Sequence, residues 1–297
     1  MVKNANEILF RASSNGHLMV DGNSISELQL KEIEDLLSRD KITAIQNKKL
    51  DALIYKRDNP ELSEGVKTHL VNIFVSERYG RKEYATSKFL DKGNEREEDA
   101  VTLLSRVTKK FYKKNTIKLS NEFVKGEPDL SDSNDILKAK ETTDTKCCWS
   151  AHTFFRTQKE KVNPIYKWQG VTYMWLTGAT KHNIAYCLVN GTAKAILDEK
   201  KKVSWNYGID ADIYPEYVEQ CKQIEINHIF DIEEFKKENP HFDFHNDLSE
   251  WSFDIPKEER VYIISFDRCE NEINKLRKRI IDCRKYMNKN LFKANEN

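Results

Sequence analysis

The segment Asp144-Thr145-Lys146 contains residue types that suit phosphate or metal chemistry. Side chains two residues apart in a β-strand lie on the same face, so Asp144 and Lys146 would place a carboxylate beside an ammonium. Asp129, in the upstream turn Gly126-Glu127-Pro128-Asp129, could bring a second carboxylate to the same point. Carboxylate and main-chain carbonyl oxygens form a hard site suited to Mg²⁺ or Mn²⁺. A lysine there suits a phosphate or a metal-bound water.

The triplet alone has a plainer interpretation, an exposed hairpin with an ion pair that contributes little to stability. Similar triplets occur at Asp198-Glu199-Lys200 and Glu234-Phe235-Lys236, in charged segments typical of solvated helix faces. The context of Asp144 differs, because its neighbours are apolar or strand-forming and a Pro-Asp pair precedes it. Both interpretations stay open for this segment taken by itself.

Two further segments place polar groups on predicted helices. Glu97 stands at a helix start, where the helix dipole would hold a carboxylate ionised. Gln169 and Tyr173 are four residues apart, so they lie on one side of a helix. The alternatives are an acidic helix N-terminus and an amphipathic helix with a polar edge.

The elements that must position these residues follow from hydrophobic periodicity. We predict helices over 95–112, with Gly93 as a break just ahead, and over 164–177. Alternating or apolar runs predict strands over 117–124, 136–139, 142–149 and 183–189. Strands interleaved with helices indicate an α/β or α+β core with one covered sheet.

The flanking regions are predicted to be mostly helical. Apolar residues recur at helical spacing between residues 24 and 79, after starts at Ser24 and at Pro60 to Ser63. After Gly191 the chain is highly charged and ends in a helix over 270–289 that we expect to dock on the core. The spacing is carried by Ile273, Leu276, Ile280, Cys283 and Met287.

Taken in order, these segments resemble the PD-(D/E)XK nuclease superfamily, and most closely its lambda-exonuclease-like (YqaJ-like) and RecB-like phage exonucleases. Gly93, Glu97 and Ala100 fit the Gly-x-x-x-Glu-x-x-Ala start of their first core helix, and Gln169 and Tyr173 fit their Gln-x-x-x-Tyr helix. The resemblance implies a restriction-endonuclease-like core at 92–190, with a mixed central sheet flanked by helices. Residues 1–91 and 191–297 would be helical additions. The pair at 147–148, both cysteine, departs from the small polar residues often found there.

The resemblance implies a role for each matching residue. Metal ligands would be Glu97, Asp129, Asp144 and the main-chain carbonyl of Thr145. Lys146 would position or activate the attacking water, and Gln169 and Tyr173 would orient that lysine and the DNA backbone. Glu98 competes with Glu97, since the sequence cannot rank two adjacent carboxylates.

The expected function is therefore that of a Mg²⁺-dependent (or Mn²⁺-dependent) DNA exonuclease acting on duplex ends in phage-type recombination. The resemblance further implies a ring-shaped homo-oligomer and a single-strand annealing protein as partner. An endonuclease of the same superfamily, restriction-type or structure-selective, is one alternative. A non-catalytic DNA-binding module with a dead nuclease core is another.

Composition limits where DNA could bind. The 297 residues are 39% apolar, enough for a core, and 49 Lys+Arg against 48 Asp+Glu give a formal net charge of +1. Any nucleic-acid site must therefore be local. Candidate contacts are Lys109, Lys110, Lys113 and Lys114, with Ser63 and Lys67 for a terminal phosphate and a second cluster at 277–285. Since 33% of residues are charged, ordinary surface charge is the competing explanation.

Other classes of protein are disfavoured. Apolar runs fall far short of the ~20 residues that cross a bilayer, and the first ten residues lack a signal-peptide pattern. Six dilute cysteines without a C-x-x-C pair argue against disulfide, zinc and iron–sulfur scaffolds. We expect a reducing, cytoplasmic setting, the host cytoplasm if the chain is phage-encoded. The stretch from His241 to His245 is expected to be a loop without ligands.

Overall fold

The computed structural model describes residues 2–20, 25–58, 61–83, 87–208 and 210–293. The predicted starts at Ser24 and Pro60 lie outside these ranges. The chain divides into two compact units. The sheet unit comprises Tyr84–Leu119 and Gly126–Cys269, and the helical unit comprises Met1–Glu83, Ser120–Lys125 and Glu270–Asn297. The division into a core at 92–190 and helical additions at 1–91 and 191–297 remains a prediction.

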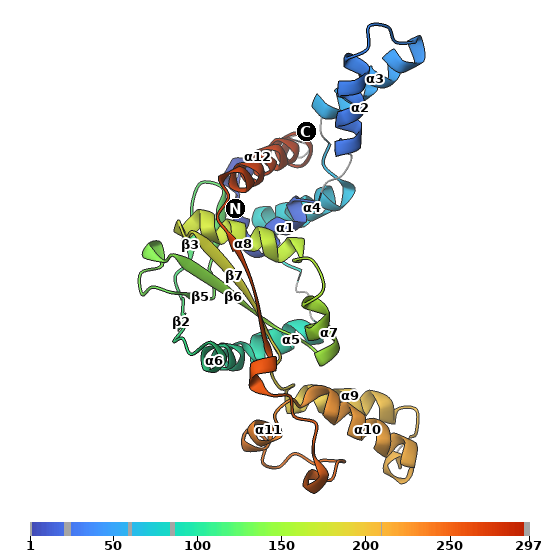
Figure 1. Ribbon diagram of the computed structural model, residues 1–297, viewed down its shortest axis with the longest axis vertical. Coiled ribbons are helices and arrows are strands. Elements are labelled where there is room, and N and C mark those ends of the chain that lie inside the picture. The colour runs from blue at the N-terminus through green and yellow to red at the C-terminus, as the bar shows by residue number, and fades with distance from the viewer. Residues whose placement is uncertain (1, 21–24, 59–60, 84–86, 209, 294–297) are drawn as a thin grey trace. The chain divides into compact units, whose positions relative to one another are not determined.

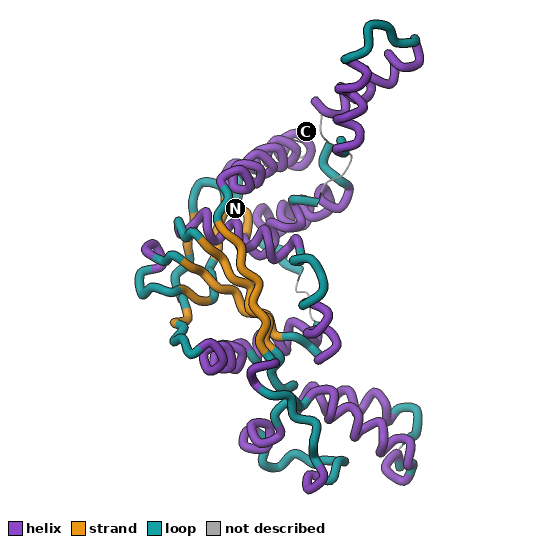
Figure 2. The backbone as a smooth tube through the Cα atoms, viewed as in Figure 1, coloured by secondary structure: helices purple, strands orange, loops and turns teal. Residues whose placement is uncertain are grey.

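The sheet unit is built on a mixed sheet with the strand order β2-β5-β6-β7-β8 within the described residues (Figure 1). Its strands are β2 (Lys113–Lys114), β5 (Leu130–Ser131), β6 (Glu141–Cys147), β7 (Lys181–Cys187) and β8 (Val261–Asp267). β6 and β7 are parallel, and the other neighbouring pairs are antiparallel. The expected mixed central sheet flanked by helices is confirmed (Figure 2).

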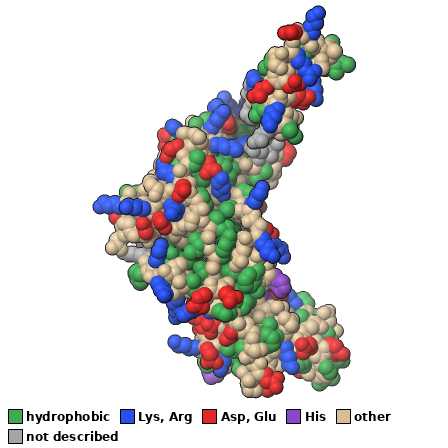
Figure 3. Space-filling model, viewed as in Figure 1, with side chains coloured by type: hydrophobic (Ala, Val, Ile, Leu, Met, Phe, Trp, Pro, Cys, Tyr) green, Lys and Arg blue, Asp and Glu red, His purple; other side chains and the backbone are tan. Residues whose placement is uncertain are grey.

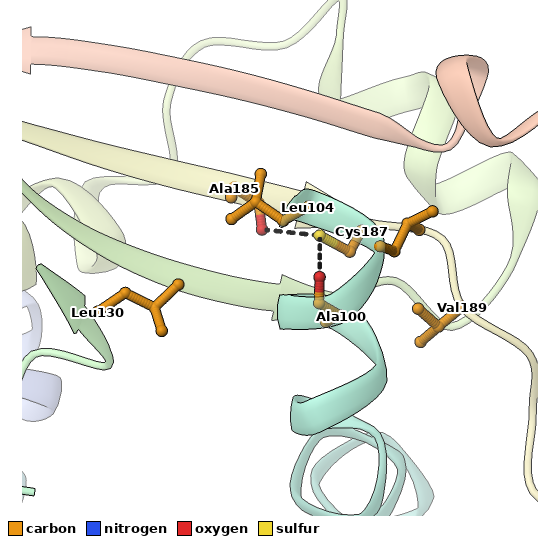
Figure 4. Close-up of a cluster of buried hydrophobic side chains, with 7 residues drawn as sticks. Ala100, Leu104, Leu130, Ala185, Cys187 and Val189 are labelled. Carbon is orange, nitrogen blue, oxygen red and sulfur yellow. Dashed lines mark hydrogen bonds between the residues drawn. The ribbon is translucent and has the colours of Figure 1, made fainter. Parts of the chain in front are cut away.

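Both faces of the two central strands are covered. α6 (Glu97–Thr108) packs on one face, where Ala100 and Leu104 meet Leu130, Ala185 and Cys187 (Figure 4). On the other face lie α7 (Ala151–Thr157) and α8 (Pro164–Thr177). Because side chains alternate along β6, its residues 144 and 146 face α8, and its residues 143, 145 and 147 face α6.

Local signals fix the helices around the sheet. α8 begins at Pro164 after the Asn163 cap and ends at Gly178, whose φ of 81° is left-handed. The predicted break at Gly93 was wrong, because Gly93 lies inside α5 (Lys88–Glu95) and the chain breaks at Arg96. The Arg96 guanidinium donates to the Gly191 carbonyl at 3.1 Å, which holds the break in place. The Cys147 thiol on β6 donates to the Arg96 carbonyl at 3.4 Å.

The predicted helical region after Gly191 is confirmed in part. It contains α9 (Ala193–Ser204), α10 (Pro215–His228) and α11 (Ile232–Glu238). α9 and α10 are joined by a buried ion pair between Lys200 Nζ and Glu225 Oε1 at 2.7 Å. The edge strand β8 follows, and the helical prediction for this region missed it.

Two predicted strands were wrong. Most of 117–124 is not strand, because the Asn121 side chain accepts hydrogen bonds from the main-chain N–H groups of Phe123 and Val124 and forms a turn. Residues Ile136–Lys138 form a 3-10 helix, since Asp135 caps it through the Leu137 N–H. Within the described residues, no helix combines the length and apolar character needed to cross a bilayer.

The helical unit contains a short parallel pairing between β1 (Phe10–Arg11) and β4 (Val124–Gly126). The other short strand is β3 (Leu119–Ser120), and the helices are α1 (Asn15–Leu18), α2 (Glu27–Leu37), α3 (Ala44–Asp58), α4 (Glu64–Tyr79) and α12 (Glu270–Met287), followed by the π-helical turn η7 (Asn288–Phe292). The predicted C-terminal helix and its apolar face are present. Buried Arg284 of α12 donates to the carbonyls of Ile8 and Glu122, both at 2.7 Å.

Candidate functional site

The predicted carboxylates meet where β5 ends beside β6. Leu130 pairs with Thr143, so continuing this register by one residue sets Asp129 opposite Asp144. The ladder stops at that point, and Asp129 Oδ2 accepts hydrogen bonds from the Thr145 N–H at 2.8 Å and the Thr145 hydroxyl at 3.2 Å. The carboxylate thereby pairs a main-chain N–H group of β6 at a point that β5 no longer covers.

On the α8 face of β6, Asp144 and Lys146 lie side by side as their spacing predicts. Asp144 is 2% exposed, and its Oδ2 contacts Lys146 Nζ directly. Lys146 Nζ also donates to Gln169 Oε1 at 3.4 Å and lies 4.7 Å from the ring centroid of Tyr166. The ammonium is thus held by a carboxylate, an amide and an aromatic face.

Gln169 closes this arrangement from α8. Its Nε2 donates to Asp144 Oδ1 at 3.3 Å and to the Tyr173 hydroxyl oxygen at 2.9 Å. Its Oε1 accepts from Lys146, so one amide bridges both members of the Asp-x-Lys pair. These contacts fix the amide orientation and immobilise four predicted residues as one network.

Burial and neighbouring charges shift the pKa values of two residues at this site. Burial, reinforced by the charge of Asp144, raises the pKa of Asp129 to about 7. Burial alone would lower the pKa of Lys146, but the adjacent Asp144 carboxylate raises that pKa above its ordinary value. At neutral pH the site therefore holds a charged lysine and an Asp129 carboxyl group that is close to its own pKa.

Glu97 belongs to the same electrostatic environment. Its charge helps to raise the pKa of Asp129, after the contributions from burial and from Asp144. It also forms an ion pair with Lys114 at 3.3 Å. The neighbouring Glu98 is exposed, whereas Glu97 is half-buried.

The metal expectation can be compared with this geometry. Among the described residues, no three His, Cys, Asp or Glu side chains form a ready-made metal-binding group. The donor chemistry nevertheless fits a divalent cation, because Asp144 Oδ2 is buried and, despite touching the ammonium, has no well-directed hydrogen bond. The carbonyl of Thr145 lies on the same strand edge as its N–H, which Asp129 accepts. Oxygens of this kind suit Mg²⁺ or Mn²⁺.

Sequence reasoning missed a histidine behind the network. His182 on β7 is fully buried, and its Nδ1 shares a hydrogen bond with the Thr142 hydroxyl at 2.9 Å. Burial lowers the pKa of His182 to about 4, so its ring is neutral. Gly170 leaves room for it, since a Cβ there would lie 2.2 Å from His182 Cδ2. Only the fold brings these residues together.

Lys92 on α5 was also missed. It is 2% exposed, and Nζ donates to the carbonyls of Cys148 at 2.8 Å and Trp149 at 3.3 Å. Burial lowers the pKa of Lys92 to about 8. Lys92 thereby holds the chain just after Asp144-Thr145-Lys146, and such a contact leaves no local sequence signal.

The predicted DNA contacts are divided between the units. Lys109 and Lys110 are exposed at the end of α6, and Lys114 pairs with Glu97; the side chain of Lys113 lies outside the described part. Ser63 and Lys67 belong to the helical unit, where Ser63 caps α4 by accepting from the Val66 N–H at 3.2 Å. Figure 3 shows basic and acidic side chains interspersed on the visible face.

Comparisons with solved structures found chains of similar fold. A phage-related exonuclease from Haemophilus somnus 129PT is similar with a TM-score of 0.59 and 18% identity, covering 97% of this chain and 97% of that chain. An alkaline exonuclease from Laribacter hongkongensis gives a TM-score of 0.49 at 10% identity over 94% of this chain and 87% of that chain. A structure of the latter with dAMP gives 0.46, with the same identity and coverage. No family model and no curated protein matches the chain.

Proposed function

We propose that the chain is a Mg²⁺-dependent DNA exonuclease that hydrolyses phosphodiester bonds from duplex ends. One observation carries the proposal: Asp144, Lys146 and Gln169 form one network on β6 and α8, and at the end of β5 Asp129 binds the same strand through the Thr145 N–H. The similarity in fold to a phage-related exonuclease supports the same assignment. A role in phage-type recombination, a ring-shaped homo-oligomer and a single-strand annealing partner belong to this proposal as well.

Asp129, Asp144, the Thr145 carbonyl and Glu97 would hold the cation. When bound, a divalent ion lowers the pKa of a coordinated water and neutralises charge on the phosphate. Burial, followed by the charge of Asp144, raises the pKa of Asp129, and a bound cation would stabilise the ionised carboxylate against both.

Lys146 would act as a fixed positive charge. Its raised pKa keeps the amine protonated at neutral pH, so it suits holding a phosphate oxygen or an attacking water better than removing a proton. Gln169 fixes the direction of that ammonium through Oε1 while donating to Asp144 through Nε2. Tyr173 in turn fixes the amide.

The test is digestion of an end-labelled linear duplex by the full chain, with Mg²⁺ and with a chelator. We expect mononucleotides from the linear substrate, no cutting of a circular duplex and no release with chelator. Asp144→Asn and Lys146→Ala should each lower the cleavage rate by about 10²- to 10³-fold, because interactions with developing charge carry large catalytic effects. Cleavage of the circular duplex would identify the chain as an endonuclease instead of an exonuclease.

Control variants separate loss of chemistry from loss of structure. Asp198→Asn removes an exposed carboxylate of α9, and Lys181→Ala removes a lysine of β7 whose side chain is 41% exposed. Both should digest DNA at the wild-type rate. Wild-type digestion by folded Asp144→Asn or Lys146→Ala would remove the assignment.

A further inference from the structure

The helical unit contains a cavity of about 750 Å³ between the start of α4 and the last turns of α12 and η7. Its lining is Arg57, Glu61, Leu62, Lys67, Lys278, Asp282, Lys285, Tyr286, Lys289 and Asn290. We call this cavity the α4/α12 groove. It shares no residue with the carboxylate site, which belongs to the sheet unit.

The α4/α12 groove has a strong local charge. Five cationic side chains face two acidic ones, although the whole chain carries a net charge of only +1. Lys278, Lys285 and Lys289 follow one another along a single side of the α12 end, at spacings of seven and four residues. Lys285 forms an ion pair with Asp282 at 3.7 Å and Lys67 forms one with Glu64 at 2.8 Å. Lys278 and Lys289 form no ion pair among the described residues.

Two other cavities show that this excess is specific to the groove. The cavity beside Trp149 is lined by four lysines and four carboxylates. The cavity at the α9–α10 pair contains Lys200, whose ammonium already binds Glu225. Neither presents a surplus of available positive charge, so neither favours an anion as the α4/α12 groove does.

We infer that the α4/α12 groove binds the sugar-phosphate backbone of DNA. The inference rests on the proposed function in taking DNA as the ligand. Lys278 and Lys285 are about 10.5 Å apart along the helix axis, close to three phosphate steps of about 3.4 Å in one strand of a duplex. The half-buried Tyr286 offers a ring to a sugar or base in the same groove.

An acidic protein partner fits the groove less well. Protein interfaces depend on aromatic or aliphatic anchors buried at their centre. The apolar residues in this lining are the half-buried Tyr286 and Leu62, and Leu62 is itself buried in the unit with 9% exposure. A lysine-lined groove with few apolar anchors matches a uniform polyanion better.

The experiment measures DNA binding by the full chain in the presence of chelator, so that cleavage plays no part. Fluorescence anisotropy follows a labelled blunt duplex and, separately, a single strand of the same length over a series of salt concentrations. Removing two phosphate contacts should make the slope of log K against log salt shallower by about 1.8 for duplex or about 1.4 for single strand. We expect this change in the Lys278→Ala/Lys285→Ala variant.

Matched variants interpret the result. Lys194→Ala/Lys202→Ala removes the same charge from the balanced cavity and should leave the slope unchanged. Lys278→Arg/Lys285→Arg keeps the charge and should bind like wild type. A change confined to one DNA form identifies that form as the ligand. An unchanged slope with both forms, or an equal change in the control pair, overturns the inference.

The proposed function and this inference can fail separately. A chain that digests DNA while Lys278→Ala/Lys285→Ala binds normally would keep the nuclease and refute the groove. A chain that never digests DNA but loses salt-dependent binding in this variant would keep the groove and refute the nuclease.

Discussion

Replacing Asp129 by asparagine should stabilise the chain increasingly as the pH rises. Burial and the charge of Asp144 raise the pKa of Asp129 from 3.8 to about 7. Between these values the folded state holds a proton that the unfolded state has released, so the free energy of unfolding falls as the pH increases. From pH about 5.5 to 8 this amounts to about 2 kcal/mol, because the slope is about 1.36 kcal/mol per pH unit below the folded-state pKa and vanishes above it.

Asparagine has no proton to lose, and its Oδ1 can still accept from the Thr145 N–H that Asp129 binds at 2.8 Å. The stability advantage of Asp129→Asn over wild type should therefore grow by about 2 kcal/mol between pH about 5.5 and 8. For a domain of about 150–250 residues, the difference in Tm should widen by about 4–8 °C.

The assay is thermal unfolding at both pH values in chelator, with Asp198→Asn as the control because that carboxylate is exposed on α9. A difference in Tm that does not change with pH would refute the reasoning. Equal widening for Asp198→Asn would also refute it, since the effect would then not depend on burial beside Asp144. Added Mg²⁺ should raise the Tm of wild type more than that of Asp129→Asn at the higher pH.

Two further substitutions test packing and buried charge. Gly170→Ala should lower the free energy of unfolding by about 3 kcal/mol, because the new Cβ overlaps His182 at 2.2 Å, whereas Gly93→Ala meets nothing within 4 Å and should be neutral or stabilising. Equal urea unfolding midpoints for Gly170→Ala and Gly93→Ala would contradict this packing. Glu225→Gln should cost about 3–5 kcal/mol, since it leaves the Lys200 ammonium buried without its counter-charge. A loss below about 1 kcal/mol in urea unfolding would show that the pair tolerates separation.

Much of the sheet could be predicted, because its central strands combine β-forming residues with local patterns. β6 and β7 fall within two residues of the predicted segments. The strand predictions failed where a side chain, instead of a neighbouring strand, accepts the main-chain hydrogen bonds, as at Asn121 and Asp135. β8 is rich in β-branched and aromatic residues from Val261 to Phe266, but its pairing partner β7 lies more than 70 residues earlier, so no local signal specifies the pairing.

Part of the site could also be predicted, because local residue spacing brings some of its side chains together. Periods of two and of four residues bring Asp144 to Lys146 and Gln169 to Tyr173. That Asp129 would accept the Thr145 N–H depends on where β5 ends, which the sequence does not specify. Lys92 acts through carbonyls 56 and 57 residues away, and such contacts follow only from tertiary structure.

The contact between the Cys147 thiol and the Arg96 carbonyl has a practical consequence for work on the native chain. Burial raises the pKa of Cys147 to about 11 and that of Cys148 to about 12, so both thiols are mostly protonated at neutral pH and react slowly with alkylating reagents. Cys147 is partly exposed and Cys148 is buried, so labelling of Cys148 in native buffer requires a transient opening beside β6. The modification rate of Cys148 therefore measures how often the chain opens locally beside the strand that carries Asp144 and Lys146.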